Sequence, residues 1–182
     1  MTENEFYAQL EKHKGDQYLI PHFDFSHGAG LDSKVLFLLE SPGPQVRKTG
    51  LISLRNNDLS ARHLNEQLTK SRADLRDIVL WNIVPWILKN GTGFATPTAD
   101  EIKDARQFTR KLFEVFQKIT TIVFLGRKSQ REMPFYSGHT TYRLLAAHHP
   151  GAQAMAQPGR WEENVAVFKR LNAVNSCIRS KT

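Results

Sequence analysis

Four short apolar runs, each closed by glycine, proline or a polar residue, constrain the fold of this chain more than any other feature. They occupy residues 35–39, 77–86, 120–126 and 142–150. Each has the length and the aliphatic, β-branched composition of a buried strand. Strands that are apolar throughout are typical of parallel sheets covered on both faces. The runs therefore predict a mostly parallel four-stranded sheet.

Helical patterns alternate with these runs. Residues 3–14 and 59–70 predict two helices, and residues 44–57 between the first two runs are polar and turn-like. Thr98 and Glu101 form a capping box, which opens a long helix whose apolar residues recur as far as Ile119. A last helix starts near Arg160. Strands alternating with amphipathic helices predict a three-layer α/β/α sandwich around the sheet.

The 182 residues suit a single domain, 1–182, with residues 1–33 as an N-terminal helix and lead-in and residues 34–175 as the core. Cys177 is the only cysteine, which excludes an internal disulfide, a cysteine-based zinc site and an iron–sulfur cluster. We expect neither a metal nor an organic cofactor. The sequence has neither a membrane-length apolar run nor a signal-peptide pattern, so we expect a cytoplasmic protein, a monomer without membrane contact.

The charge is basic and unevenly distributed. Lys and Arg number 25 against 18 Asp and Glu, a net charge of +7, and the surplus falls in residues 101–182. A basic half suits a polyanion such as nucleic acid, because Lys and Arg displace counterions from phosphates. It equally suits a surface that only keeps the protein in solution. The charge alone does not separate these two interpretations.

Polar residues stand at the ends of the four predicted strands. They are the loop 40–44, Asn82, the pair Gly126 and Arg127, and the segment 148–151. Ligands of open α/β sheets bind beyond the carboxyl ends of the strands, so these segments predict one shared site. An asparagine amide both donates and accepts hydrogen bonds, and a histidine donates to a developing anion. The group suits a small polar ring.

In motif and order, these segments resemble the uracil-DNA glycosylase superfamily. The motifs are Val-Leu-Phe-Leu-Leu-Glu-Ser-Pro-Gly-Pro at 35–44, Trp-Asn-Ile-Val-Pro-Trp at 81–86, Val-Phe-Leu-Gly-Arg at 123–127 and His-Pro-Gly at 149–151. The likeness spans about residues 34–172. It implies an α/β/α sandwich and a repair enzyme that removes uracil, or a related deaminated base, from DNA after the base has left the stack.

The resemblance implies a role for each matching residue. Ser41 or Glu40 would position the attacking water, and Asn82 would read the edge of the base. His149 would hydrogen-bond the base as negative charge builds on it. The walls of the base pocket would include Pro42, Gly43 and Leu51.

The resemblance for the loop 151–157, together with the cations at the start of a helix near 127, predicts a further set of residues on the DNA. They are Gly126, Arg127, Lys128, Gly151, Gln153 and Met155. Arg127 and Lys128 begin a helix, where cations oppose the helix dipole, and this favours a phosphate contact. In the loop 151–157, Gln153 and Met155 are the candidates for a wedge that fills the space left by the base.

The chain also departs from its relatives. Ser41 stands where relatives often carry Asn, Asp or Ala. Residues 44–80 contain no Phe, Tyr or Trp, although relatives place there the ring that stacks on uracil, so Leu51, Arg55 or Trp86 would have to replace it. These departures keep two alternatives open: a module that binds nucleic acid or damaged bases without cutting them, and a hydrolase of free nucleosides or nucleotides.

Overall fold

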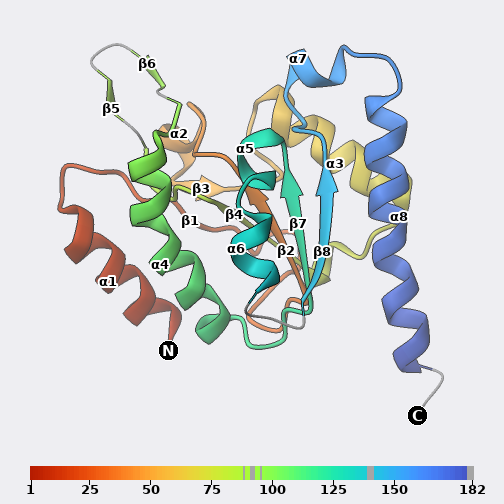
Figure 1. The fold of residues 1–182 in the computed structure, drawn as a ribbon, viewed down its shortest axis with the longest axis horizontal. Helices are drawn as coiled ribbons and strands as arrows, with labels where there is room; N and C mark the ends of the chain where they lie inside the picture. The colour runs from red at the N-terminus through yellow and green to blue at the C-terminus, as the bar shows by residue number, and fades with distance from the viewer. Residues whose placement is uncertain (88, 91–92, 95, 139–141, 180–182) are drawn as a thin grey trace.

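The central sheet has four parallel strands. We describe a computed structural model, which covers residues 1–87, 89–90, 93–94, 96–138 and 142–179. The strands are β2 (Val35–Leu39), β4 (Ile78–Asn82), β7 (Thr121–Leu125) and β8 (Arg143–Ala147), in the spatial order β4-β2-β7-β8. Every pairing is parallel, so the four carboxyl ends meet at one edge, as the arrowheads in Figure 1 show. The predicted strands are confirmed.

Helices cover the sheet on both sides. In Figure 1, α1 (Glu3–Lys14) and α4 (Ala99–Val115) lie on one side, and α3 (Leu59–Ser71) and α8 (Arg160–Arg179) lie on the other. Within each layer the two helices pack against each other. The three-layer α/β/α sandwich is thereby confirmed. Among the described residues, no helix combines the length and the apolar character needed to cross a membrane.

The predicted capping box at the start of α4 is present. The amide of Glu101 donates to Thr98 Oγ1 over 3.2 Å, and the amide of Thr98 donates to Glu101 Oε2 over 2.7 Å. The helix ends at Val115, earlier than the apolar pattern to Ile119 predicts. Phe116 leaves the helix at φ −102°, ψ 74°, and its ring is buried in the core. Phe116 and Ile119 are therefore apolar because they are buried in the core, not because they belong to the helix, and this explains why the pattern predicts too long a helix.

Short elements fill the connections. They are β1 (His22–Phe23), α2 (Val46–Thr49), β3 (Leu51–Ile52), the 3-10 helix η1 (Leu75–Asp77), β5 (Lys89–Asn90), β6 (Gly93–Phe94), α5 (Arg127–Gln130), α6 (Met133–Ser137) and α7 (Ala152–Met155). The polar segment 44–57 is therefore more than a turn. It contains α2 and β3, and β3 pairs in parallel with β1. This pairing places the second half of the segment beside the carboxyl edge of the main sheet.

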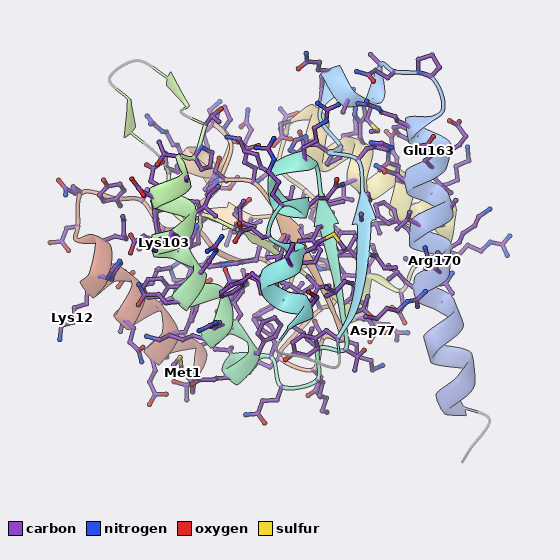
Figure 2. The ribbon with its side chains drawn as sticks, viewed as in Figure 1. Met1, Lys12, Asp77, Lys103, Glu163 and Arg170 are labelled. Carbon is purple, nitrogen blue, oxygen red and sulfur yellow. The ribbon has the colours of Figure 1, made fainter. Side chains whose placement is uncertain are left out.

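The core fills both spaces between the layers. Trp81 of β4 and Phe37 of β2 are completely buried, and Phe6 and Leu10 of α1 belong to the same cluster. The side chains in Figure 2 show how the two edges of the sheet differ in position: Glu163 lies at the carboxyl edge and Asp77 at the amino edge. A rigid, fully covered sheet thus holds the loops at its carboxyl edge.

Candidate active site

A cavity of about 220 Å³ lies at the carboxyl edge of the sheet. The ends of β2 and β4, the segment after α2, the start of α3 and the loop after β8 all contribute to it. Its polar lining residues are Ser41, Ser53, Asn56, Asp58, Ser60, Asn82 and His149. The structure therefore brings Ser41, Asn82 and His149 together from three distant parts of the chain, and Pro42 and Gly43 line the same cavity.

Asn82 ends β4, opposite Leu39 of β2, and only 2% of it is exposed. Its Nδ2 is buried and has no hydrogen-bond partner among the residues that the structure describes. Leaving such a donor unpaired costs about 1–3 kcal/mol, so most buried polar groups in proteins are paired. An unpaired amide on the wall of a cavity is placed to bind a ligand that accepts a hydrogen bond.

His149 follows β8 and is held in one tautomer. Its Nδ1 lies 2.9 Å from the backbone nitrogen of Gly151, and a backbone N–H can only donate. Nδ1 is therefore the acceptor, and the proton of the neutral ring is on Nε2. Burial lowers the pKa of His149 below its usual value, although the negative charges of Glu40 and Asp58 act to raise it. At neutral pH the ring is uncharged, and Nε2–H remains to donate.

Two glycines pack directly against this imidazole. A Cβ on Gly126 would lie 2.9 Å from the Cβ of His149, and a Cβ on Gly151 would lie 2.8 Å from its Nδ1. Gly126 also has a φ of +90°, which L side chains rarely adopt. The sequence interpretation assigned both glycines to DNA contact, and it missed that they fix the position of the histidine ring.

A buried polar network holds the loop that carries His149. Asn164 of α8 is completely buried; its Oδ1 accepts from the amide of His148 over 2.7 Å and its Nδ2 donates to the carbonyl of His148 over 3.0 Å. The same Nδ2 donates to Gln67 Oε1 of α3 over 3.2 Å. His63 of α3 contacts the carbonyl of Pro150 through Nδ1 at 2.8 Å. The sequence analysis missed these residues. They could have been found as polar side chains that fall on the apolar face of a predicted helix.

The neighbouring His148 points elsewhere. Its Nε2 lies 2.6 Å from Glu163 Oε2 of α8, which Figure 2 labels at the top of that helix. It does not line the cavity. Of the two adjacent histidines, only His149 therefore faces the candidate site.

The structure leaves Glu40 outside the cavity lining. Its Oε1 lies 3.3 Å from Nζ of Lys128, and Lys128 also donates to the carbonyl of Pro97 over 3.1 Å. Lys128 is therefore tied to two neighbours, whereas Arg127, which precedes it, is exposed. Glu40 contributes charge near His149 but no cavity surface.

None of the three expected replacements for a stacking ring lines the cavity. Leu51 lies outside the lining and Ile52 lies in it, because adjacent residues of a strand point to opposite faces. Trp86 is completely buried away from the cavity, and Arg55 is exposed. The wall is aliphatic instead. Its members include Leu39, Val46, Ile52, Leu54, Leu64 and Leu80.

The two wedge candidates differ in position. Gln153 is exposed on α7. Met155 is only partly exposed, and its sulfur lies 2.9 Å from Nε2 of Gln67. The contact with α3 leaves Gln153 as the more accessible of the two.

A larger hollow of about 830 Å³ lies at the amino edge of the sheet, around Asp74, Arg76 and Asp77. None of the predicted site residues lines it. In the part of the chain that the structure describes, no group of three or more His, Cys, Asp or Glu residues is arranged to hold a metal ion.

Fold and site together define an α/β/α protein with a ligand pocket at the ends of its parallel strands. Comparison with known families agrees with the motif resemblance. The family model described as the uracil DNA glycosylase superfamily matches residues 25–174, and the chain belongs to this superfamily. Its members are DNA glycosylases, hydrolases of base excision repair that act on DNA.

Two solved structures share the fold. Wild-type SMUG2 from Pedobacter heparinus is 17% identical, with a TM-score of 0.60, over 95% of this chain and 99% of that one. A candidate uracil DNA glycosylase from Methanosarcina acetivorans is 17% identical, with a TM-score of 0.52, over 84% of this chain and 97% of that one. At this identity the likeness shows the fold alone. No curated protein matches the sequence.

Proposed function

We propose that this protein hydrolyses the N-glycosidic bond of uracil, or of a related deaminated base, after the base has been flipped out of DNA. Membership of the superfamily supports the reaction class. One observation carries the proposal: Asn82 and His149 line the same cavity. Asn82 Nδ2 has no hydrogen-bond partner among the described residues, and Nε2 of His149 carries the proton of its ring.

The chemistry explains why these two groups are needed. Breaking the bond between C1′ and the base leaves positive charge on the sugar and negative charge on the departing base. Donors fixed in advance near the forming anion stabilise the transition state more than the ground state. Asn82 would bind the polar edge of the base, and Nε2–H of His149 would donate to the oxygen on which charge accumulates.

The remaining lining residues suit a flat ring. The aliphatic wall from Ile52, Leu54 and Leu80 would contact the face of the base in place of an aromatic ring. Ser41 brings a hydroxyl into the cavity and would orient the attacking water. Pro42 and Gly43 would limit the space on the same side.

DNA would approach the carboxyl edge of the sheet. Exposed cations stand on the elements around the cavity, namely Lys48 on α2, Arg62 on α3 and Arg127 on α5. They would contact phosphates on both sides of the flipped nucleotide, and binding would weaken as salt concentration rises. Gln153 on α7 would enter the space that the base leaves.

The test is incubation with single- and double-stranded oligonucleotides that contain uracil, hypoxanthine or xanthine, followed by alkaline cleavage of abasic sites. We expect strand breaks with at least one of these bases, and breaks that form at least on the order of 10²-fold more slowly with His149→Ala at the same protein concentration. Tight binding without breaks would favour a binding module. Release from free nucleosides but not from DNA would favour a nucleoside hydrolase.

A further inference from the structure

The cavity contains one carboxylate, and it is not the one that the motif suggested. Among the lining residues only Asp58 is acidic, and none is Lys or Arg. Glu40 is outside the lining and pairs with Lys128. Among the lining residues, Asp58 is therefore the one whose carboxylate can accept a proton from a water in the cavity.

Asp58 is held at the start of α3. Its Oδ1 accepts a hydrogen bond from the amide of Ala61 over 2.9 Å, which makes it the N-cap of the helix. Within the described residues Oδ2 makes no hydrogen bond, and Asp58 forms no ion pair. One oxygen thus fixes the carboxylate, and the other is available to a molecule in the cavity.

Two further groups mark this part of the cavity as the reacting region. Asp58 and His149 line the same cavity, whereas Glu40 does not. Burial keeps the pKa of His149 below its usual value, and the negative charges of Glu40 and then of Asp58 act against this effect. Asn82 contributes its unpaired, 2%-exposed amide to the same cavity. Carboxylate, imidazole and amide therefore surround one ligand volume.

We propose that Asp58 is a catalytic residue: its carboxylate accepts the proton of the attacking water and stabilises the positive sugar. This inference rests on the proposed function. The water oxygen forms a bond to C1′ while the bond between C1′ and the base nitrogen breaks. The electron pair of that bond leaves with the base, and one proton of the water passes to Asp58. Asp58 later releases the proton to solvent, the departed base anion takes up a proton from solvent, and the products are an abasic sugar and the neutral base.

A purely structural Asp58 would act only as the cap of α3, and Asp58→Asn separates the two roles. Asparagine caps a helix as well as aspartate does, but it has no charge and does not take up a proton at neutral pH. The matched control is Asp74→Asn. Asp74 also caps a helical turn, through a bond of 3.1 Å from the amide of Arg76, but it lies at the amino edge of the sheet.

The experiment measures single-turnover excision from a uracil oligonucleotide, the binding constant for the same DNA, and the melting temperature. We expect Asp58→Asn to cut the rate on the order of 10²-fold or more, as loss of a general base does, with binding and melting temperature preserved. We expect Asp74→Asn to keep the wild-type rate. Glu40→Gln should lose less rate than Asp58→Asn.

Asp58→Asn with a rate within about threefold of wild type would overturn the inference, and so would a larger loss in Glu40→Gln. A loss of rate would also overturn it if binding fell by the same factor or if the melting temperature fell as well, because loss of the helix cap alone explains that result. A wild-type protein inactive on every base tested would overturn the proposed function, and the inference with it. An active wild type with an active Asp58→Asn would overturn the inference alone.

Discussion

Substitution of Gly126 by alanine tests whether the backbone around His149 fixes the histidine ring for catalysis. Gly126 adopts φ 90°, ψ 163°, a conformation almost restricted to glycine. An alanine Cβ there would lie 2.9 Å from the Cβ of His149 and 3.4 Å from its Cδ2. Carbon atoms in contact are ordinarily about 3.5–4.0 Å apart, so the ring or the strand end must move by about half an ångström or more.

The expected loss has two parts. The backbone conformation costs alanine about 1–3 kcal/mol, which lowers the melting temperature of a protein of this size by about 2–4 °C per kcal/mol. Displacement of the imidazole also moves Nε2 away from the forming anion. A misplacement near 1 Å can reduce a rate by about 10²-fold, and we expect Gly126→Ala to lose between 10- and 100-fold in excision.

Gly15→Ala is the matched control. Gly15 has almost the same conformation, φ 77°, ψ 164°, but a Cβ there would have nothing within 4 Å. Both variants should lose stability from the backbone conformation, measured by thermal unfolding, and Gly126→Ala should lose more because of its contact with His149. Only Gly126→Ala should lose excision rate at a temperature where both are folded. Equal rates in the two variants would refute the argument that Gly126 positions His149.

Four further results are expected. His149→Ala should lower the single-turnover rate on the order of 10²-fold or more with little change in melting temperature, because it removes a donor to the developing anion. The rate should be constant above pH 6.5 and fall at a lower pH, since burial lowers the pKa of His149 from 6.5 and protonation of Nδ1 would break the bond from Gly151; a rate that rises on acidification would contradict this. The same depressed pKa means that the unfolded state takes up the proton first, so stability measured by denaturant unfolding should be lost as pH falls from 6.5 through the lower folded value. Asn82→Ala should weaken binding of uracil-containing DNA more than binding of the matching undamaged DNA, because in the proposed function its amide would contact only the flipped base.

The strands, and the positions of Asn82 and His149 at their carboxyl ends, could be predicted because the signals are local. An apolar run that ends in a polar residue places Asn82 at the carboxyl end of β4, and the parallel arrangement then brings it near the end of β8. His149 follows from the same rule. Neither step needs knowledge of how the helices pack.

The pocket walls could not be predicted in the same way. The segment after α2 has too few apolar residues to show a strand, and its pairing with β1 depends on a contact far along the chain. Without the phase of β3, Leu51 and Ile52 are equivalent in the sequence, and the prediction chose the residue on the wrong face. The sequence Asn-Asn-Asp at 56–58 is typical of a turn and a helix cap, and this pattern does not show that Asp58 also lines the cavity.

The position of His149 depends both on the strand ends and on the helices of one layer, and this is the reason that a motif alone does not define the site. Gly126 and Gly151 limit the ring from the strand side, while Asn164 and His63 hold the adjoining backbone from the helices. Each contact restricts the orientation of the imidazole before the reaction, so less conformational entropy is lost when the transition state forms. Buried polar networks of this kind are sensitive to the loss of one partner, because the group left behind remains unpaired. Changes in α3 or α8 that never touch a base should therefore alter excision through the loop that carries His149.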